Sequence, residues 1–218
     1  MGGPAAGRAV TDWPHVFRPG TGLAVLALHG TGGSESEIAA LAARIAPGAA
    51  ILAPRGRVSE NGAGRWFRRA SEGVFDVDDV LYRADELAGF VTEAIADYDL
   101  GALPLVAMGF SNGANMALAL ATLHPELAPS VVAFSGMYPF GTRTMPRDLG
   151  GSRFLLLNGT DDPMAPQGSV DTLVAGAAAR GADVTRISRK GGHGISDEEL
   201  AQAAEWIGTR ASGAVQTR

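Results

Sequence analysis

Short apolar segments that alternate with segments of helical periodicity constrain the fold of this chain most strongly. The first apolar run, Leu23–Leu28, is of the kind that forms a strand buried on both faces. It ends at a glycine-rich turn, after which Ser34 and Glu37 have the spacing of a capped helix start. The cycle recurs, with further strands expected at 50–53, 103–108, 130–134, 154–157 and 183–187 and helices at about 80–97, 112–124, 169–180 and 197–209. This alternation predicts an α/β fold with a mostly parallel sheet and helices on both faces.

The size and composition of the chain suit one domain with its own core. It has 218 residues, of which 46% are hydrophobic and 19% charged, so extensive disorder is excluded. We expect a single domain over 11–210, with flexible tails at 1–10 and 211–218. The Gly-, Ala- and Pro-rich start lacks the apolar stretch of a secretion signal, and no apolar run reaches the roughly 18 residues needed to cross a bilayer. We therefore expect a cytoplasmic protein without stable membrane association.

Charge and cysteine content exclude several functional classes. The chain has 18 Lys and Arg against 23 Asp and Glu, a net charge of −5, which argues against a nucleic-acid partner. It has no Cys, which excludes disulfides, thiolate metal sites and cysteine nucleophiles. We expect neither a metal nor an organic cofactor. The oligomeric state cannot be predicted from these features.

A candidate nucleophile lies between an expected strand and an expected helix. The segment Gly109-Phe110-Ser111-Asn112-Gly113 matches the G-x-S-x-G pattern of a nucleophile elbow. Such an elbow turns sharply and holds its serine in a strained conformation, and its glycines leave space for neighbouring chain. The simpler interpretation is a glycine-bounded turn whose serine only caps the helix.

A serine hydroxyl needs an imidazole base, which in turn needs a carboxylate to orient it. Of the four histidines, His193 is the best candidate because it lies in a Gly-Gly-His-Gly turn after the last expected strand. Asp161 and Asp162 follow the strand at 154–157, and either could orient the imidazole. The order Ser, Asp, His is the one expected for an α/β-hydrolase.

Two backbone amides could stabilise the negative charge that develops on the substrate's carbonyl oxygen. Asn112 follows the nucleophile at a helix N-terminus, and Thr31 lies in the glycine-rich loop 29–33. The alternative, that this loop cradles a phosphate, is weaker because the loop lacks the Lys-Ser/Thr pair of a P-loop.

At these residues the sequence resembles the α/β-hydrolase superfamily, and within it the phospholipase/carboxylesterase family of bacterial carboxylesterases and acyl-protein thioesterases. The resemblance rests on LHGTGG at 28–33, GFSNG at 109–113, GTDDPMAP at 159–166 and GGHG at 191–194. It implies an α/β-hydrolase domain with no inserted cap and with Thr31 and Asn112 as the oxyanion amides. In that family the orienting acid directly precedes a Pro, which implies a triad of Ser111, Asp162 and His193.

Residues 54–78 resemble a bacterial subgroup related to hydroquinone- and quinone-responsive esterases. Members of the family often carry Asp after the oxyanion glycine and Gln after the nucleophile, whereas this chain has Gly33 and Asn112 there. The substrate preference of the thioesterases is therefore not transferred to this chain.

Two long segments, 54–78 and 136–152, fit neither a helix nor a strand pattern and follow the carboxyl ends of expected strands, where ligands bind in such sheets. Segment 54–78 carries five arginines among aromatic residues. One arginine could bind a polar or anionic end of the substrate; alternatively, the arginines could pair with Glu60, Glu72 and Asp76 on a solvated loop. We expect the substrate pocket to be lined by Trp66, Phe67, Phe75 and Met164.

These features together predict a serine carboxylesterase that hydrolyses small carboxylic esters through an acyl-enzyme. Two alternatives remain at this point: a thioesterase or lysophospholipase with the same triad, and a hydrolase-fold ligand receptor with vestigial catalysis. The physiological substrate, its acyl length and its leaving group cannot be read from the sequence.

Overall fold

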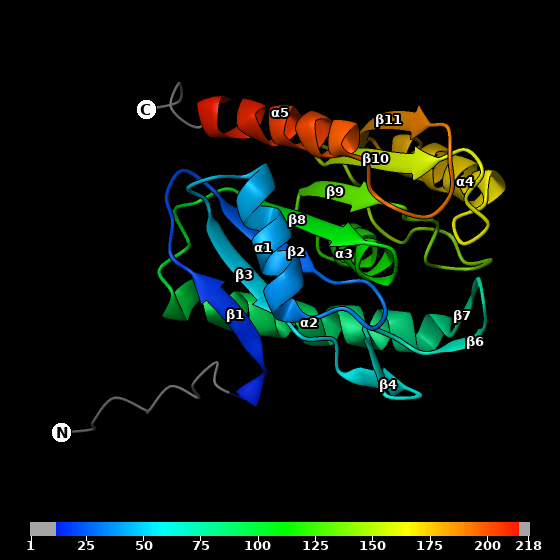
Figure 1. Ribbon diagram of the computed structural model, residues 1–218, viewed down its shortest axis with the longest axis horizontal. Helices are drawn as coiled ribbons and strands as arrows, with labels where there is room; N and C mark the ends of the chain where they lie inside the picture. The colour runs from blue at the N-terminus through cyan, green and yellow to red at the C-terminus, as the bar shows by residue number, and fades with distance from the viewer. Residues whose placement is uncertain (1–11, 214–218) are drawn as a thin grey trace.

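A computed structural model describes residues 12–213 and shows a seven-stranded sheet in the order β1-β3-β2-β8-β9-β10-β11 (Figure 1). The strands are β1 (His15–Arg18), β2 (Ala24–Leu28), β3 (Ala50–Pro54), β8 (Leu105–Phe110), β9 (Ser130–Phe134), β10 (Arg153–Gly159) and β11 (Asp183–Arg189). All neighbouring strands pair in parallel except β1, which runs antiparallel to β3. The expected tail at 1–10 lies outside the described residues.

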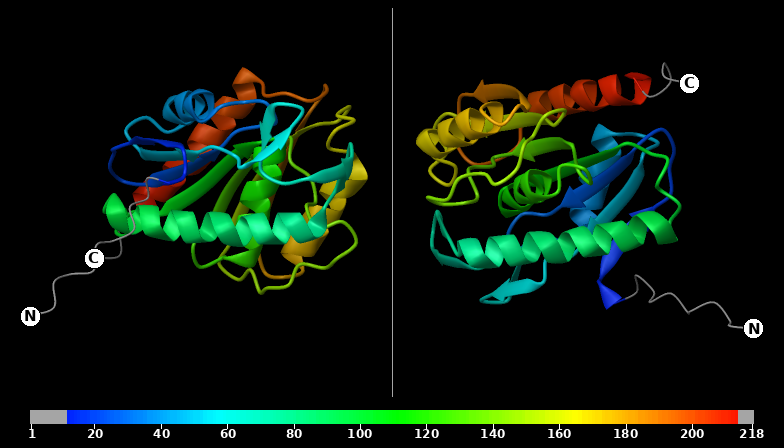
Figure 2. Two further views of the ribbon diagram at one scale, coloured as in Figure 1. Left: turned by 90° about the horizontal axis from the view of Figure 1, so that it is seen from below. Right: turned by 180° about the vertical axis from the view of Figure 1, so that it is seen from behind.

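Five helices cover the two faces of the sheet. They are α1 (Glu35–Ile45), α2 (Val77–Asp97), α3 (Asn112–Leu123), α4 (Gln167–Ala178) and α5 (Asp197–Gly213). Helices α1 and α5 lie on one face, and α2, α3 and α4 lie on the other (Figure 2). The last helix extends three residues into the segment 211–218, expected as a tail; residues 214–218 lie outside the described part of the chain.

Side chains from alternate positions of the central strands form two apolar cores, one under each helical layer. In β2, Leu26 and Leu28 face the core beneath α2 and α3, whereas Val25 and Ala27 face the core beneath α1 and α5. A strand buried on both faces must be apolar at every position, which explains the unbroken apolar run in the sequence. The predicted α/β fold with helices on both faces is therefore confirmed.

Helix α1 begins where the sequence pattern predicts. The Glu37 backbone amide donates to Ser34 Oγ at 3.3 Å, and the Ser34 amide donates to Glu37 Oε2 at 2.9 Å. This reciprocal pair satisfies backbone donors that the first turn of a helix leaves free. None of the described helices combines the length and the apolar character that a membrane span requires.

The segment expected to be irregular at 54–78 contains two small hairpins. One pairs β4 (Val58–Glu60) with β5 (Ala63–Arg65), and the other pairs β6 (Arg69–Ser71) with β7 (Val74–Phe75). Asn61 and Gly62 form the first turn with φ of 52° and 84°, the left-handed region that such turns require. Both hairpins lie at the end of the molecule toward which the arrows of β8, β9 and β10 point (Figure 1). The segment 136–152 forms turns and bends, as expected.

Candidate active site

Ser111 lies at a sharp turn between the end of β8 and the start of α3. Its backbone has φ 54° and ψ −118°, a strained conformation for a residue with a side chain. A Cβ atom on Gly109 would lie 2.4 Å from the Gly113 carbonyl carbon, and one on Gly113 would lie 2.1 Å from Leu28 O. Only glycine fits at these two positions, as a nucleophile elbow requires.

Asp162 and His193 meet at the carboxyl edge of the sheet. His193 Nδ1 lies 2.8 Å from Asp162 Oδ2, and the carboxylate, 4% exposed, also accepts at Oδ1 from the amides of Met164 (2.8 Å) and Ala165 (3.2 Å). The pairing places the imidazole proton on Nδ1 and leaves Nε2 as an acceptor. Nε2 is buried and has no hydrogen-bond partner within residues 12–213, so it is not hydrogen-bonded to Ser111.

The other candidate carboxylate, Asp161, is not the one hydrogen-bonded to the imidazole. Asp161 is exposed, and its backbone amide donates to Gly191 O at 2.9 Å. Among the described residues, no three His, Asp or Glu side chains form a group that could hold a metal ion.

The turn that carries His193 is held by Arg189, a residue that sequence reasoning missed. Arg189 Nη2 donates to Gly192 O at 2.9 Å and to Gly194 O at 2.8 Å, while Nε donates to Glu199 Oε2 at 2.7 Å. Glu199 is buried and also caps α5, where Oε2 accepts from the Ser196 amide at 2.8 Å. The Ser-x-x-Glu spacing at 196–199 indicates this helix cap in the sequence, and the cap in turn places the carboxylate that binds Arg189.

The loop that carries Thr31 is fixed by a buried histidine. His29 Nε2 accepts from the Gly56 amide at 3.0 Å, so this imidazole is neutral with its proton on Nδ1, which lies 2.7 Å from Gly30 O. Burial lowers the pKa of His29 below its usual value, because the charged form would lose its hydration. Trp66 Nε1 donates to His29 O at 2.8 Å and adds a second attachment to the loop.

A hollow of about 20 Å³ brings the expected nucleophile, the oxyanion residues and two of the expected pocket residues together. Its lining includes Ser111, Thr31, Asn112, Phe75, Met164, Asn115, Ser135, Arg65, Arg69 and Glu72. Phe75 also borders a groove of about 440 Å³ between β7 and α4, with Val74, Met137 and Tyr138. A third hollow of about 220 Å³, lined by Phe110 and Ile195, shares the lining residue Thr31 with the first.

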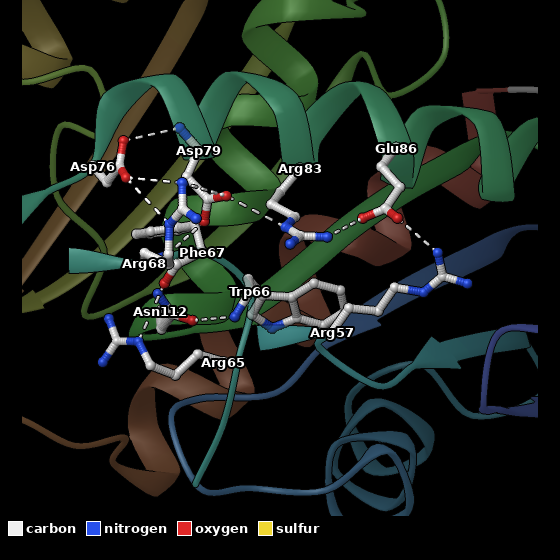
Figure 3. Close-up of polar contacts among 10 residues, drawn as sticks. All are labelled: Arg57, Arg65, Trp66, Phe67, Arg68, Asp76, Asp79, Arg83, Glu86 and Asn112. Atoms are coloured by element: carbon white, nitrogen blue, oxygen red, sulfur yellow. Dashed lines mark hydrogen bonds and ion pairs between the residues drawn. The ribbon is translucent and has the colours of Figure 1, made fainter. Parts of the chain in front are cut away.

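Trp66 and Phe67 do not line these hollows, contrary to the expectation from sequence. They are 2% and 0% exposed and pack in the core beneath the hairpins. The Trp66 amide donates to Asn112 Oδ1 at 2.8 Å, which ties the residue after the nucleophile to the segment between β5 and β6 (Figure 3). Burial of large aromatic side chains stabilises the folded protein, so these two residues contribute to the core and do not contact the substrate.

The arginines of segment 54–78 divide into two groups. Arg55, Arg57 and Arg68 pair with acidic residues outside the hollow, at Glu35, Glu86 (2.7 Å) and Asp76 (3.1 Å). Of these partners, Asp76 is one that the solvated-loop alternative names. Figure 3 shows Arg65 extending on the other side of the segment, near Asn112. Arg65 and Arg69 both pair with Glu60 at 3.0 Å, but they also line the hollow at Ser111.

Both the sequence and the fold of this chain are similar to those of known proteins. The phospholipase/carboxylesterase family model matches residues 21–210. The putative hydrolase MhqD of Bacillus subtilis (strain 168) is 35% identical over 193 residues, which cover 88% of this chain and 96% of that protein.

Solved structures share the fold over nearly the whole length of both chains. The Bacillus cereus carboxylesterase is 34% identical with a TM-score of 0.85, covering 92% of this chain and 95% of its own. A carboxylesterase from Mesorhizobium loti is 30% identical, with a TM-score of 0.84 and coverage of 91% and 96%. YahD, solved with malic acid, is 28% identical, with a TM-score of 0.83 and coverage of 91% and 99%.

Proposed function

The chain belongs to the phospholipase/carboxylesterase family and is a hydrolase, and from this premise we propose that it is a serine carboxylesterase acting on small carboxylic esters. The observation that carries the proposal is the strained Ser111 at a glycine-bounded elbow, together with an Asp162–His193 pair whose Nε2 is free to accept a proton. This combination supplies a nucleophile, a base and an orienting carboxylate.

In the proposed reaction, Ser111 Oγ attacks the ester carbonyl while His193 Nε2 takes its proton. Asp162 stabilises the imidazolium that forms. The negative oxygen lies at the Thr31 and Asn112 amides; the Asn112 amide is one of the donors that the first turn of α3 leaves free. His193 then gives its proton to the leaving alcohol, and a water molecule, activated by the same imidazole, hydrolyses the acyl-enzyme.

The surroundings of Ser111 favour a small substrate. The hollow at the serine is narrow and largely polar, and larger apolar space begins beyond Phe75 and beyond Thr31. YahD was solved with malic acid, a small hydroxy-dicarboxylic acid, which is in keeping with a small polar ligand for this chain too. The Asp162–His193 pair argues against a receptor with vestigial catalysis, because a receptor needs no oriented base.

Labelling with a fluorophosphonate tests this proposal. We expect Ser111 to be labelled, p-nitrophenyl acetate to give a burst followed by turnover, and Ser111→Ala to lose both. Only a residual rate of about 10³–10⁴ over water, from binding and the oxyanion amides, should remain. As a control, Ser135→Ala, which removes another strained serine of the same hollow, should still be labelled at Ser111. Labelling at any other serine, or full activity of Ser111→Ala, contradicts the proposal.

A further inference from the structure

The hollow at Ser111 is rich in hydrogen-bond donors. Arg65, Arg69, Asn112 and Asn115 line it, whereas Glu72 is the one carboxylate among its described lining residues. Glu72 is paired with Arg69, and its side chain is 57% exposed at the rim. A donor-rich lining of this kind complements an anion.

Arg65 is unusual because its guanidinium is buried. Its side chain is 3% exposed, and burial lowers its pKa, because the cation has lost its hydration. Nη1 donates to Glu60 Oε2 at 3.0 Å and Nε donates to Phe67 O at 3.3 Å, so the guanidinium is held in one orientation. Arg69 Nη2 lies 3.0 Å from the same Oε2 atom. Glu60 thus pairs with both cations from outside the lining of the hollow, and Glu72 pairs with Arg69 alone.

Asn112 presents a hydrogen-bond donor without a partner among the described residues. Its Oδ1 accepts from the Trp66 amide at 2.8 Å, which fixes the orientation of the side-chain amide (Figure 3). The opposite end, Nδ2, is buried and has no hydrogen-bond partner among residues 12–213. A buried donor without an acceptor is costly, so a native site that keeps one calls for an acceptor from a ligand.

Arg65 and Arg69 are assigned to the acyl part of the ester, because they line a different hollow from the one bordered by Phe110. His193 must deliver a proton to the leaving oxygen, so the alcohol lies on the imidazole side. The 220 Å³ hollow bordered by Phe110, whose ring centroid is 5.1 Å from that of His193, offers space for the alcohol. The arginines line the other hollow, which shares the lining residue Thr31 with it.

We propose that the substrate is a monoester of a dicarboxylic acid, whose free carboxylate binds Arg65 and Arg69 and whose acyl group hydrogen-bonds Asn112 Nδ2. This inference rests on the proposed esterase function. Ser111 Oγ bonds to the acyl carbon as the bond to the alcohol oxygen breaks, and the alcohol leaves with the proton from His193. Water then adds to the acyl carbon and breaks its bond to Oγ, which releases the dicarboxylate and returns the proton to Ser111.

A pair of esters matched in shape tests the inference. Mono-4-nitrophenyl glutarate carries a carboxylate where 4-nitrophenyl 5-oxohexanoate carries a neutral methyl ketone, and spontaneous hydrolysis is subtracted for both. We expect kcat/KM to be higher for the glutarate. The ratio of the two values should fall about tenfold to a hundredfold in Arg65→Gln, the range for a lost charge-assisted hydrogen bond. It should also fall in Arg69→Gln and decrease as salt screens the charges.

Arg68→Gln is the matched control, because Arg68 belongs to the same segment but pairs with Asp76 and Asp79 away from the hollow. Its ratio should equal that of the unmodified enzyme. If Arg65→Gln does not fold, Arg69→Gln and the salt dependence of the unmodified enzyme decide the question. A ratio of one or less, or a ratio unchanged in the Arg69 variant and by salt, overturns the inference. Hydrolysis of the ketone ester and labelling of Ser111 in the same preparations report separately on the esterase function.

Discussion

The carboxylate of Asp162 has both of its oxygens committed. Oδ1 accepts from two backbone amides and Oδ2 faces His193, so the group cannot rotate without losing a hydrogen bond. Its neighbour Asp161 has the same side chain one position earlier, yet it is exposed and makes no contact with the imidazole. Asp161 lies in the turn that follows β10, whereas Asp162 is buried and accepts from the Met164 and Ala165 amides.

We predict that substitution of the two aspartates lowers kcat to very different extents. Asp162→Asn should lower kcat for p-nitrophenyl acetate by about 10⁴-fold, because the imidazole loses both its orientation and the charge that stabilises its protonated form. Asp161→Asn should change kcat by no more than a few-fold. Steady-state kinetics on both variants, with matched thermal unfolding, measures this. A larger loss in the Asp161 variant would mean that the orienting carboxylate is misassigned.

At the scale of elements, the His193 turn depends on a side chain from β11 rather than on its own residues. Three of the four turn residues are glycines, which offer no side chains to fix the backbone. Arg189 binds two of the turn's carbonyls and is itself anchored by the buried Glu199. The arrangement couples the position of the base to the start of α5.

We predict that Arg189→Met lowers kcat by about tenfold to a hundredfold with a smaller change in KM, because a base displaced by about 1 Å transfers protons poorly. Arg189→Lys, which keeps a donor, should recover part of the loss. The rate of fluorophosphonate labelling should fall in parallel. Arg186→Met is the matched control, since Arg186 lies on the same strand but pairs with Asp171 and Gln167. Equal losses in the two Met variants would contradict a role in positioning.

Elements with a strong local pattern could be predicted from the sequence, and those defined by long-range contacts could not. Helix α1 and the strands β2 and β9 follow from capping and apolar runs. Strand β1 was missed because four half-exposed residues show no periodicity and pair only with the distant β3. The Asn61-Gly62 turn was a readable hairpin signal, but Arg189 contacts and the burial of Trp66 depend on how separate segments meet.

On the scale of the whole molecule, His29 links the loop after β2 to the segment that follows β3. Its ring joins the oxyanion loop to Gly56, and its backbone carbonyl binds Trp66, which packs in the core beneath α2 and α3. Protonation of Nε2 would remove the acceptor for Gly56 and place a charge in a buried position. The folded state therefore prefers the neutral imidazole.

We predict that this preference makes part of the stability dependent on pH. Because the folded-state pKa of His29 is lowered from 6.5, its contribution is complete above that pH and is lost as the pH falls below it toward the folded pKa. Urea unfolding at pH 7.5 and pH 5.0 should show a larger loss for the unmodified chain than for His29→Gln, at about 1.4 kcal/mol per unit of pKa difference. Parallel losses in both chains would contradict this account.

The two outer strands of the sheet are poorly suited to pairing with a strand from another molecule. β11 carries Asp183, Arg186 and Arg189 along its seven residues, and β1 has only four residues and ends at Arg18. Short or charged margins disfavour the addition of a strand from another molecule, which is the usual route to fibrils and domain exchange. Neither edge of the sheet therefore favours its continuation by a strand from a second copy of the chain.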